Sequence, residues 1–422
     1  MNGKIKTPAW VAGKTIYEVN LRQFTKEGTI KAFEAHLQRL KDLGVGILWF
    51  MPIQPIGKKN RKGTLGSYYS IRNYTEVNPE FGTLDDFKSL VQKIHDLGMK
   101  VIIDWVANHT AWDHHWTVDY PEYYDRDEKG NFKPPVKDWE DVIHLDYGNP
   151  DLWNAMIDAM KFWINEAGID GFRCDMAHLV TTLFWNRARQ VLDVMKPVYM
   201  LAESENYDLL EYAFDTIYNW KLMHAMNDIA SGKISANNLA EVIVNEFQYL
   251  PEGASSLNFT SNHDENSWQG SAIERLHYYL EPLTVLTFMI PGRPLIYSGQ
   301  EAGNYRRLKF FDKDEIEWKE DKMFGLYQKL TKFKATKLLH LSNINFIKND
   351  CQDAIISLSI SNEKHKVLVI LNLSGKKQGF YIKCSDINRD YNNVVDGQKL
   401  SFSCHDQLSL ESYGYLILWK DH

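Results

Sequence analysis

Five apolar, strand-length runs of the sequence are each followed closely by an acidic residue. These acids are Asp104 in VIIDWVANH, Asp175 in GFRCD, Glu203 in MLAE, Asp264 in FTSNHD and Glu301 in IYSGQE. Any one of them is explained as a cap on the next helix, a role that Asp fills commonly. Capping explains less well why Arg173 and His263 accompany them. Converging carboxylates without a phosphate-binding loop indicate either metal binding or the hydrolysis of a glycosidic bond.

The elements that must position these acids follow a repeating pattern. Amphipathic stretches that predict helices over 30–43, 84–97 and 152–167 each end near a glycine and are followed by an apolar run. Glycine ends a helix readily because it adopts the left-handed conformation at little cost. Apolar runs that need burial on both faces predict parallel strands. Eight are present, at 15–19, 46–51, 101–106, 171–175, 198–203, 214–218, 256–261 and 294–298.

Eight strand–helix units in one chain predict an α/β fold of the (β/α)8 TIM-barrel type, in which active-site residues lie at the C-terminal ends of the strands. The alternative is a doubly wound open sheet. That fold is disfavoured because no GxGxxG or Walker sequence follows the first strand.

Two segments break the pattern and define the domain organisation. The segment 109–145 is rich in Asp, His, Trp and Tyr and lacks helical periodicity, which predicts a short insert after strand 3, beside the site. From about residue 341 short alternating runs and turn signals predict an antiparallel β-sandwich over 341–422. The barrel is therefore predicted over 1–340, and the missing linker predicts close packing between the two.

Composition excludes several classes of protein. The chain has 422 residues, of which 44% are hydrophobic and 24% charged, as in a folded globular protein. Its net charge of −7 disfavours nucleic-acid binding. The four cysteines (Cys174, Cys351, Cys384 and Cys404) form no CxxC pair, so free thiols are expected. No apolar run has the length of a signal sequence or a membrane span, so a cytoplasmic location without membrane contact is expected.

Four short motifs resemble those of a known family. DWVANH (104–109), GFRCD (171–175), AE (202–203) and NHD (262–264) resemble, in order and spacing, the four signatures of the α-amylase family of glycoside hydrolases, family 13. The flanking NPEFGT and GRPLIYSGQE agree. The resemblance covers nearly the whole chain, and bacterial cytoplasmic α-amylases are the members that the chain resembles.

The resemblance implies a role for each matched residue. Asp175 corresponds to the nucleophile, Glu203 to the general acid/base and Asp264 to the third carboxylate, which grips the reacting sugar. We expect Arg173 to keep Asp175 ionised and Glu203 to have a raised pKa. The residues expected to bind substrate are Tyr69, His109, Arg173, His178 and His263.

Two departures from the family pattern bear on ligands. Many members bind calcium between barrel and insert through an Asn, an Asp and a backbone carbonyl. Asn108 is retained here, but His144 stands in the place of the Asp and Leu179 in the place of the His that supplies the carbonyl. Because calcium prefers charged oxygen ligands, no calcium or other cofactor is expected. The second departure is His178, which stands where many members have Lys. The subsite preference on the leaving-group side is therefore not determined by the resemblance.

The function that the resemblance implies is retaining hydrolysis of α-1,4-glucosidic bonds in starch, glycogen or maltodextrins, most simply by an α-amylase. An exo-acting α-glucosidase or maltogenic enzyme, an α-1,6-active enzyme and a transglycosylase of the same family stay open. A catalytically dead carbohydrate-binding barrel and a metal-dependent hydrolase are remote alternatives. The sequence does not determine the oligomeric state.

Aromatic residues make up 13% of the chain, including 13 Trp, and flat side chains suit the apolar faces of sugar rings. Ten are predicted in or beside the mouth of the barrel: Tyr68, Tyr69, Trp105, Trp112, Trp116, Tyr120, Tyr123, Tyr124, Trp139 and Trp268. The C-terminal module could bind starch, but a structural role is favoured. Its aromatics Tyr381, Tyr391, Tyr413, Tyr415 and Trp419 suit a core.

Overall fold

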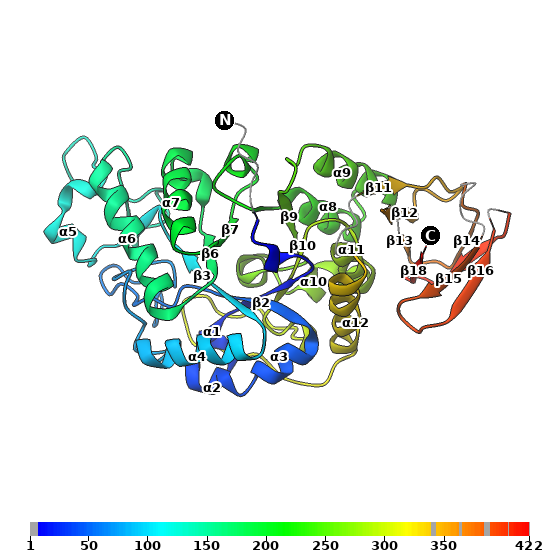
Figure 1. The fold of residues 1–422 in the computed structure, drawn as a ribbon, viewed down its shortest axis with the longest axis horizontal. Helices are drawn as coiled ribbons and strands as arrows, with labels where there is room; N and C mark the ends of the chain where they lie inside the picture. Colours follow the sequence, from blue (N-terminus) through cyan, green and yellow to red (C-terminus); the bar gives the residue numbers. More distant parts are fainter. Residues whose placement is uncertain (1–6, 339–342, 363–364, 384–388, 404, 422) are drawn as a thin grey trace.

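The computed structural model describes residues 7–338, 343–362, 365–383, 389–403 and 405–421. Figure 1 shows a central barrel, the insert at one end of the long axis and the C-terminal β module at the other. Cys384 and Cys404 lie outside the described residues, whereas Cys174 and Cys351 are free thiols as expected. Within the described ranges, no helix combines the length and the apolar character needed to cross a bilayer.

Eight parallel strands close into the barrel in the order β1-β10-β9-β8-β7-β6-β3-β2, which confirms the predicted fold. They coincide with the eight apolar runs: β1 (Thr15–Val19), β2 (Val45–Phe50), β3 (Lys100–Trp105), β6 (Gly171–Cys174), β7 (Tyr199–Ala202), β8 (Thr216–Tyr218), β9 (Ser255–Asn258) and β10 (Arg293–Tyr297). All residues of β1, β2, β6, β7 and β8 are buried, as strands covered on both faces must be.

Helices cover the outside of the barrel (Figure 1). The longer ones are α4 (Leu84–Asp96), α6 (Pro150–Ala167), α7 (Thr182–Met195), α8 (Trp220–Ala230), α9 (Ala236–Gln248), α11 (Leu280–Met289) and α12 (Lys322–Thr336). The short ones are α1 (Leu21–Phe24), α2 (Ile30–Glu34), α3 (Leu37–Leu43), α10 (Ala272–Leu276), η1 (Ala9–Val11), η3 (Ala177–Leu179), η4 (Tyr207–Leu210), η5 (Glu265–Gln269), η6 (His277–Tyr279) and η7 (Gln300–Ala302).

The predicted helices have the expected ends, with one interruption. Thr83 begins α4 with a reciprocal capping box to Asp86, and the left-handed Gly168 ends α6. The helix predicted over 30–43 is instead split into α2 and α3. At the break, the ring of His36 packs against Phe24 and Trp318, with ring centroids 5.1 and 5.4 Å apart.

The insert after β3 has little regular structure. It contains an antiparallel pair, β4 (His109–Ala111) and β5 (Val142–His144), with α5 (Trp116–Asp119) and η2 (Pro121–Tyr123) between them. The pairing sets His109 opposite His144, so the first and last residues of the pair lie together where the insert leaves the barrel.

The C-terminal module has two antiparallel sheets. One follows the order β11-β12-β13-β18-β15-β16 and the other pairs β14 with β17. The strands are β11 (Asn343–Phe346), β12 (Ile355–Ser361), β13 (His365–Asn372), β14 (Gln378–Phe380), β15 (Arg389–Asn393), β16 (Lys399–Phe402), β17 (Leu408–Leu410) and β18 (Tyr415–Asp421).

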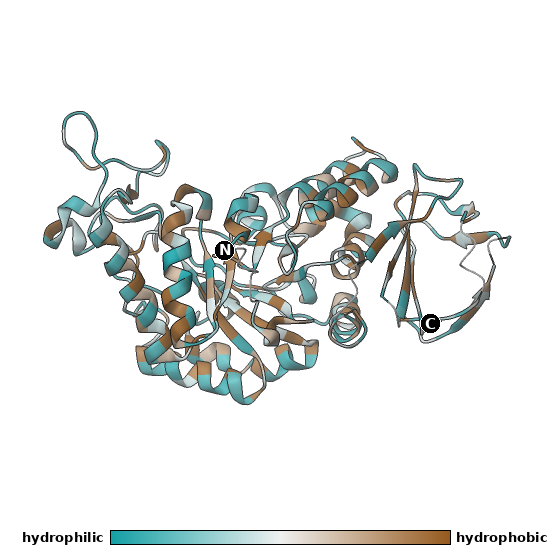
Figure 2. Ribbon diagram, turned by 45° about the horizontal axis from the view of Figure 1, so that its top comes forward, coloured by the Kyte–Doolittle hydropathy of each residue, from teal (hydrophilic) through white to brown (hydrophobic). Residues whose placement is uncertain are grey.

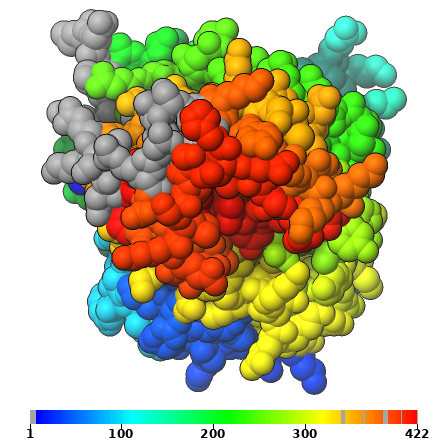
Figure 3. All heavy atoms as spheres, turned by 90° about the vertical axis from the view of Figure 1, so that its right-hand side faces the viewer, coloured from blue at the N-terminus to red at the C-terminus, as the bar shows by residue number. Residues whose placement is uncertain are grey.

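Alternate residues of the larger sheet are buried on opposite faces. Ile356, Leu358, Val367 and Val369 join the hydrophobic core of the barrel, whereas their neighbours Ile355, Leu368 and Ile370 join a separate core with Phe380. Figure 2 shows hydrophobic residues along these strands, and Figure 3 shows the face of the molecule that the module forms. The expected close packing is therefore present.

One glycine controls how closely β6 approaches β7. Gly171 pairs with Tyr199, and a Cβ atom added to Gly171 would lie 2.0 Å from the carbonyl oxygen of Tyr199. A side chain there would push apart the two strands whose ends carry Asp175 and Glu203.

We predict that Gly171→Ala lowers the free energy of unfolding by about 1–3 kcal/mol, the usual cost of overpacking a buried site. Urea denaturation measures it. The control is Gly325→Ala, on the exposed face of α12 with nothing within 4 Å of an added Cβ. This change is expected to raise the free energy of unfolding by about 0.5–1 kcal/mol, because Ala favours a helix interior. Equal effects at both positions would contradict the close approach at Gly171.

Candidate active site

One buried guanidinium lies at the centre of the acidic cluster. Arg173 has no exposed side-chain surface, and its Nη1 atom donates to Asp104 and to Asp175, each at 2.9 Å. Its Nη2 atom lies 2.9 Å from a carboxylate oxygen of Glu203. Its Nε atom donates to the hydroxyl of Tyr218 at 3.1 Å. Three carboxyl groups from three strands therefore meet around one cation.

The strand geometry explains this convergence. Asp104 and Arg173 are register partners on β3 and β6, so both side chains lie at the same level of the barrel. Asp175 is two residues beyond Arg173 and has the same orientation because side chains alternate along a strand. The backbone N–H of Glu203 donates to Cys174 at 3.0 Å, which continues the β6–β7 pairing to the acids.

A strained turn holds Asp175 and Glu203 together. Met176, which follows Asp175, has a left-handed backbone with φ 42° and ψ 44°. Its N–H donates to a carboxylate oxygen of Glu203 at 2.9 Å. A bulky residue in this conformation is uncommon and costs free energy, as is frequent at functional sites.

A second chain of polar contacts begins at Glu18 on β1. A carboxylate oxygen of Glu18 accepts from His263 Nδ1 at 2.5 Å. On the other side of the ring, His263 Nε2 lies 2.8 Å from the hydroxyl of Tyr69 and 3.2 Å from Asp264. The Tyr69 hydroxyl also donates to Asp104 at 3.1 Å. The third acid is thus joined to the Arg173 cluster through His263 and Tyr69.

The surroundings of Asp175, Glu203 and Asp264 give the three carboxyl groups different pKa values. Burial raises the pKa of Glu203 to about 7 and that of Asp175 to about 6, although Arg173 opposes both shifts. The Asp264 side chain is 37% exposed, and its pKa is lowered because the charge and hydrogen bond of His263 outweigh the effect of burial. As pH rises from acid, Glu203 is therefore the last of the three to lose its proton.

The histidines also differ. Burial lowers the pKa of His263, but Asp264 and Glu18 outweigh it and the pKa lies well above its usual value. Burial lowers the pKa of His109 to about 3, so this ring is neutral. The cluster thus presents one cationic and one neutral imidazole.

A cavity of about 360 Å³ opens above these groups. It is lined by Lys62, Ser67, Tyr69, His109, Trp139, Asp141, Val142, Asp175, Met176, Glu203, His263, Asp264, Trp268, Phe310 and Phe311. Six of the eight residues expected from the sequence are among them. Arg173 lies wholly buried beneath the cavity, and His178 is exposed on η3, outside the lining.

Several lining residues have no motif in the sequence. Lys62 and Asp141 form an ion pair of 3.2 Å across the cavity edge, and Phe310 and Phe311 come from the segment after η7. Of the ten aromatics predicted at the mouth, Tyr69, Trp139 and Trp268 line the cavity. Five others are buried instead: Tyr68, Trp105, Trp116, Tyr123 and Tyr124.

Glu301, the fifth acid of the predicted ring, lies elsewhere. It accepts from the hydroxyl of Tyr17 at 2.8 Å and from Arg39 of α3 at 2.7 Å. Tyr17 precedes Glu18 on β1, and alternate side chains leave a strand in opposite directions, so Tyr17 contacts the helix layer while Glu18 reaches His263. Glu301 is therefore part of a structural contact.

The junction of barrel and insert is closed by His144. Its Nε2 atom lies 3.2 Å from the amide oxygen of Asn108, and its Nδ1 atom 3.2 Å from Asp125. Asp125 also pairs with Lys133 at 2.9 Å. The His144 ring therefore lies against the Asn108 oxygen. The described residues contain no cluster of three or more His, Cys, Asp or Glu suited to a metal.

Comparison with known proteins gives one family. The family model described as "Alpha amylase, catalytic domain" matches residues 12–142 and 136–336 of this chain. Alpha-amylase 3 of Dictyoglomus thermophilum is 27% identical over 86% of this chain and 85% of its own length. Alpha-amylase MalA of Haloarcula japonica is 28% identical over 74% of this chain, and the match spans 46% of that longer protein.

Solved structures agree. The crystal structure of an alpha-amylase from Lactobacillus plantarum has a TM-score of 0.90 and 30% identity, over 97% of this chain and 99% of that one. A noncanonic maltogenic alpha-amylase from Thermotoga neapolitana gives the same TM-score, identity and coverage.

Proposed function

Because this chain belongs to the alpha-amylase family of glycoside hydrolases, we propose that it hydrolyses α-1,4-glucosidic bonds of starch, glycogen or maltodextrins with retention of anomeric configuration. The observation that carries the proposal is Arg173, whose guanidinium spans Asp175 and Glu203 beneath a cavity. Carboxyl groups this close suit a double displacement, which needs them only ~5–5.5 Å apart.

In the first step, Asp175 attacks the anomeric carbon and forms a glycosyl ester, while Glu203 gives its proton to the departing glycosidic oxygen. The higher pKa of Glu203, about 7, suits this donor, and the lower pKa of Asp175, about 6, suits the nucleophile. In the second step, Glu203 takes a proton from water, which attacks the anomeric carbon and releases Asp175.

The remaining groups bind the sugar. Asp264 and the cationic His263 lie at the cavity surface, where they would hold hydroxyls of the reacting ring. The face of Tyr69 lies at the same cavity and would stack on that ring, and the neutral His109 would hydrogen-bond a hydroxyl. Arg173 does not itself line the cavity, so its role is to position the acids. His178 stays a proposal for a leaving-group contact.

Two modes of action remain as candidates. An α-amylase that cleaves within chains is the first. A maltogenic enzyme is the second, favoured by the likeness to the Thermotoga neapolitana structure and by a maltogenic alpha-amylase of Bacillus acidopullulyticus that is 24% identical over 93% of this chain. The cytoplasmic location and the absence of nucleic-acid and membrane contacts stay predictions.

A product time course separates the candidates. We expect maltoheptaose and amylose to be cleaved into mixed maltooligosaccharides from the first minutes, and pullulan more slowly. Release of maltose alone from the start indicates the maltogenic mode. Cleavage of pullulan faster than amylose would contradict the α-1,4 preference.

Replacing either reacting carboxyl tests the mechanism. Asp175→Asn and Glu203→Gln keep the side-chain shape but remove the nucleophile or the proton donor, so kcat on maltoheptaose should fall by about 10³-fold or more. Glu205→Gln is the matched control, since Glu205 caps the backbone of Lys221 and does not line the cavity. Activity that survives in either of the first two variants would falsify the assigned roles.

The pH dependence follows from the two pKa values. The nucleophile works ionised, so kcat/KM should be lost as pH falls through about 6, the pKa of Asp175. The donor works protonated, so kcat/KM should be lost as pH rises through about 7, the pKa of Glu203. The interacting carboxyls titrate together, so the two limbs belong to the cluster. An activity that stays flat from pH 5 to 9 is the contrary outcome.

We also propose that the insert is held to the barrel without calcium, by the contacts of His144 with Asn108 and Asp125. A chelator should leave activity and Tm unchanged, and calorimetry should detect no tight calcium binding. His144→Ala should cost about 1 kcal/mol of unfolding free energy, the usual worth of a hydrogen bond. Activity lost in chelator and restored by calcium would overturn the proposal.

A further inference from the structure

A second cavity, of about 620 Å³, lies between the barrel and the C-terminal module. Its walls come from the segments after β9 and β10, from η6 and α11, from the start of α12, and from Ser412 and Tyr413 of the module. The volume is within the range of small-molecule sites, roughly 300–1,000 Å³. None of its lining residues lines the cavity at the carboxylates.

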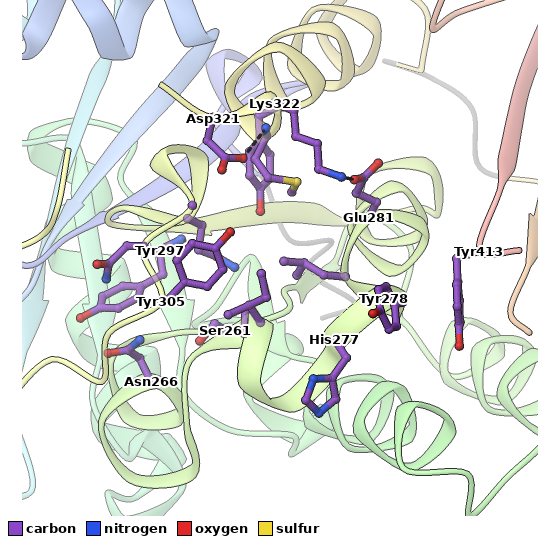
Figure 4. A pocket seen from close by; sticks show the side chains of 18 of the residues that line it. Ser261, Asn266, His277, Tyr278, Glu281, Tyr297, Tyr305, Asp321, Lys322 and Tyr413 are labelled. Atoms are coloured by element: carbon purple, nitrogen blue, oxygen red, sulfur yellow. Dashed lines mark hydrogen bonds and ion pairs between the residues drawn. The ribbon is translucent and has the colours of Figure 1, made fainter. Parts of the chain in front are cut away.

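Tyrosine rings stand at both ends of this second cavity. Figure 4 shows Tyr278 beside Tyr413 at one end, and Tyr297 with Tyr305 at the other. The rings of Tyr278 and Tyr413 are stacked, with centroids 5.5 Å apart and planes inclined by 20°. Tyr278 is 77% exposed and Tyr305 is 45% exposed. Burial in the core does not explain these exposed rings, and they offer flat apolar surface on which a ligand can stack.

The backbone is strained where it carries the stacked pair. Tyr413 has φ 56°, and His277, which precedes Tyr278, has φ 46° and ψ −125°. Non-glycine residues rarely adopt positive φ, and such outliers persist where a local arrangement is needed. Two outliers from different domains converge on one pair of rings. Core packing gives no reason for them, because Tyr278 is mostly solvent-exposed.

The polar groups of the second cavity favour an uncharged ligand. Lys322 forms an ion pair with Glu281 across the cavity, and Asp321 caps the first turn of α12. The charged groups are thus engaged with one another or with backbone. The Asn304 side chain contributes a buried oxygen that accepts no hydrogen bond from the described residues. Flat rings with amide and hydroxyl groups match a sugar, whose faces are apolar and whose rim carries hydroxyls.

Two strips of chain, η5 and the segment 306–310, lie between the two cavities. Asn266 and Ser267 of η5 donate to the backbone of Arg306 and Leu308, at 3.1 and 2.9 Å. Asn266 lines the second cavity, while Trp268 and Phe310 from the same two strips of chain line the first. The same two strips of chain therefore lie between a ligand in the second cavity and the cavity of the reacting carboxyls.

We propose that the second cavity binds a stretch of an α-glucan chain, stacked on Tyr278 and Tyr413, and keeps long substrates on the enzyme; this inference rests on the proposed function. The same polymer can occupy both cavities, so binding at the second raises the local concentration of chain at the first. Short substrates do not benefit, since they cannot reach both.

Kinetics with long and short substrates test the proposal. In Tyr278→Ala, KM for amylose should rise about five- to tenfold, as expected for the loss of one stacked ring, while kcat/KM for a p-nitrophenyl maltotrioside stays unchanged. Tyr278→Phe should restore the amylose KM because it keeps the ring. Tyr249→Ala is the matched control, a 64% exposed tyrosine outside both cavities.

Binding stoichiometry gives an independent measurement. In the Glu203→Gln background, calorimetry should find two maltoheptaose molecules per chain, and one after Tyr413→Gly is added. Glycine tolerates positive φ, so Tyr413→Gly should not lower Tm, and lost binding cannot then be ascribed to unfolding.

Two results would overturn the proposal while leaving the proposed function intact: a single maltoheptaose site in Glu203→Gln, or an unchanged amylose KM in Tyr278→Ala. A parallel loss on the short substrate would also contradict it, because the cavity would then belong to the reacting site. If the unmodified enzyme cleaves neither substrate, the proposed function itself fails.

Discussion

Three buried carboxyl groups share one guanidinium, and this imbalance of charge governs the site. Arg173 contacts Asp104, Asp175 and Glu203, and none of the three carboxyl side chains is more than 9% exposed. In a region of low dielectric constant, one cation does not offset the free-energy cost of ionising three carboxyl groups. Burial therefore raises the pKa of each acid, to about 6, 6 and 7. The site retains a proton near neutral pH, which is what a general acid requires.

A second cation, with two further acids beside it, lies on the opposite side of the barrel. His263 lies between Glu18 and Asp264, so it is held protonated by the groups it contacts. Tyr69 links this histidine to Asp104. The two halves of the barrel thus meet in one polar network, and the close approach of β6 and β7 at Gly171 sets its geometry.

Much of this arrangement was predictable from the sequence, for a physical reason. Strands buried on both faces are mostly apolar, so all eight could be located, and acids at the C-terminal ends of barrel strands lie at the same end of the barrel. Glu301 is an exception, because a position near the end of a strand does not determine the direction in which the side chain points. The Glu301 side chain pairs with Arg39 outside the barrel. Phe310, Phe311 and Lys62 were missed because loop contacts distant in sequence place them, such as Thr64 with Asp312. Tyr413, expected in the core of the module, instead lines a cavity.

The sheet of the C-terminal module has a consequence for the flank of the barrel that it covers. Its two central strands, β13 and β18, pair with each other, and residues of both complete the core on the flank of the barrel. The barrel itself closes only when Ile16 of β1 pairs with Leu295 of β10. In the folded protein, β12 packs against α9 and β13 against α11, so both helices carry uncovered apolar surface until this sheet forms. Such surface favours association with other chains, so by covering it the sheet protects this flank of the barrel from aggregation.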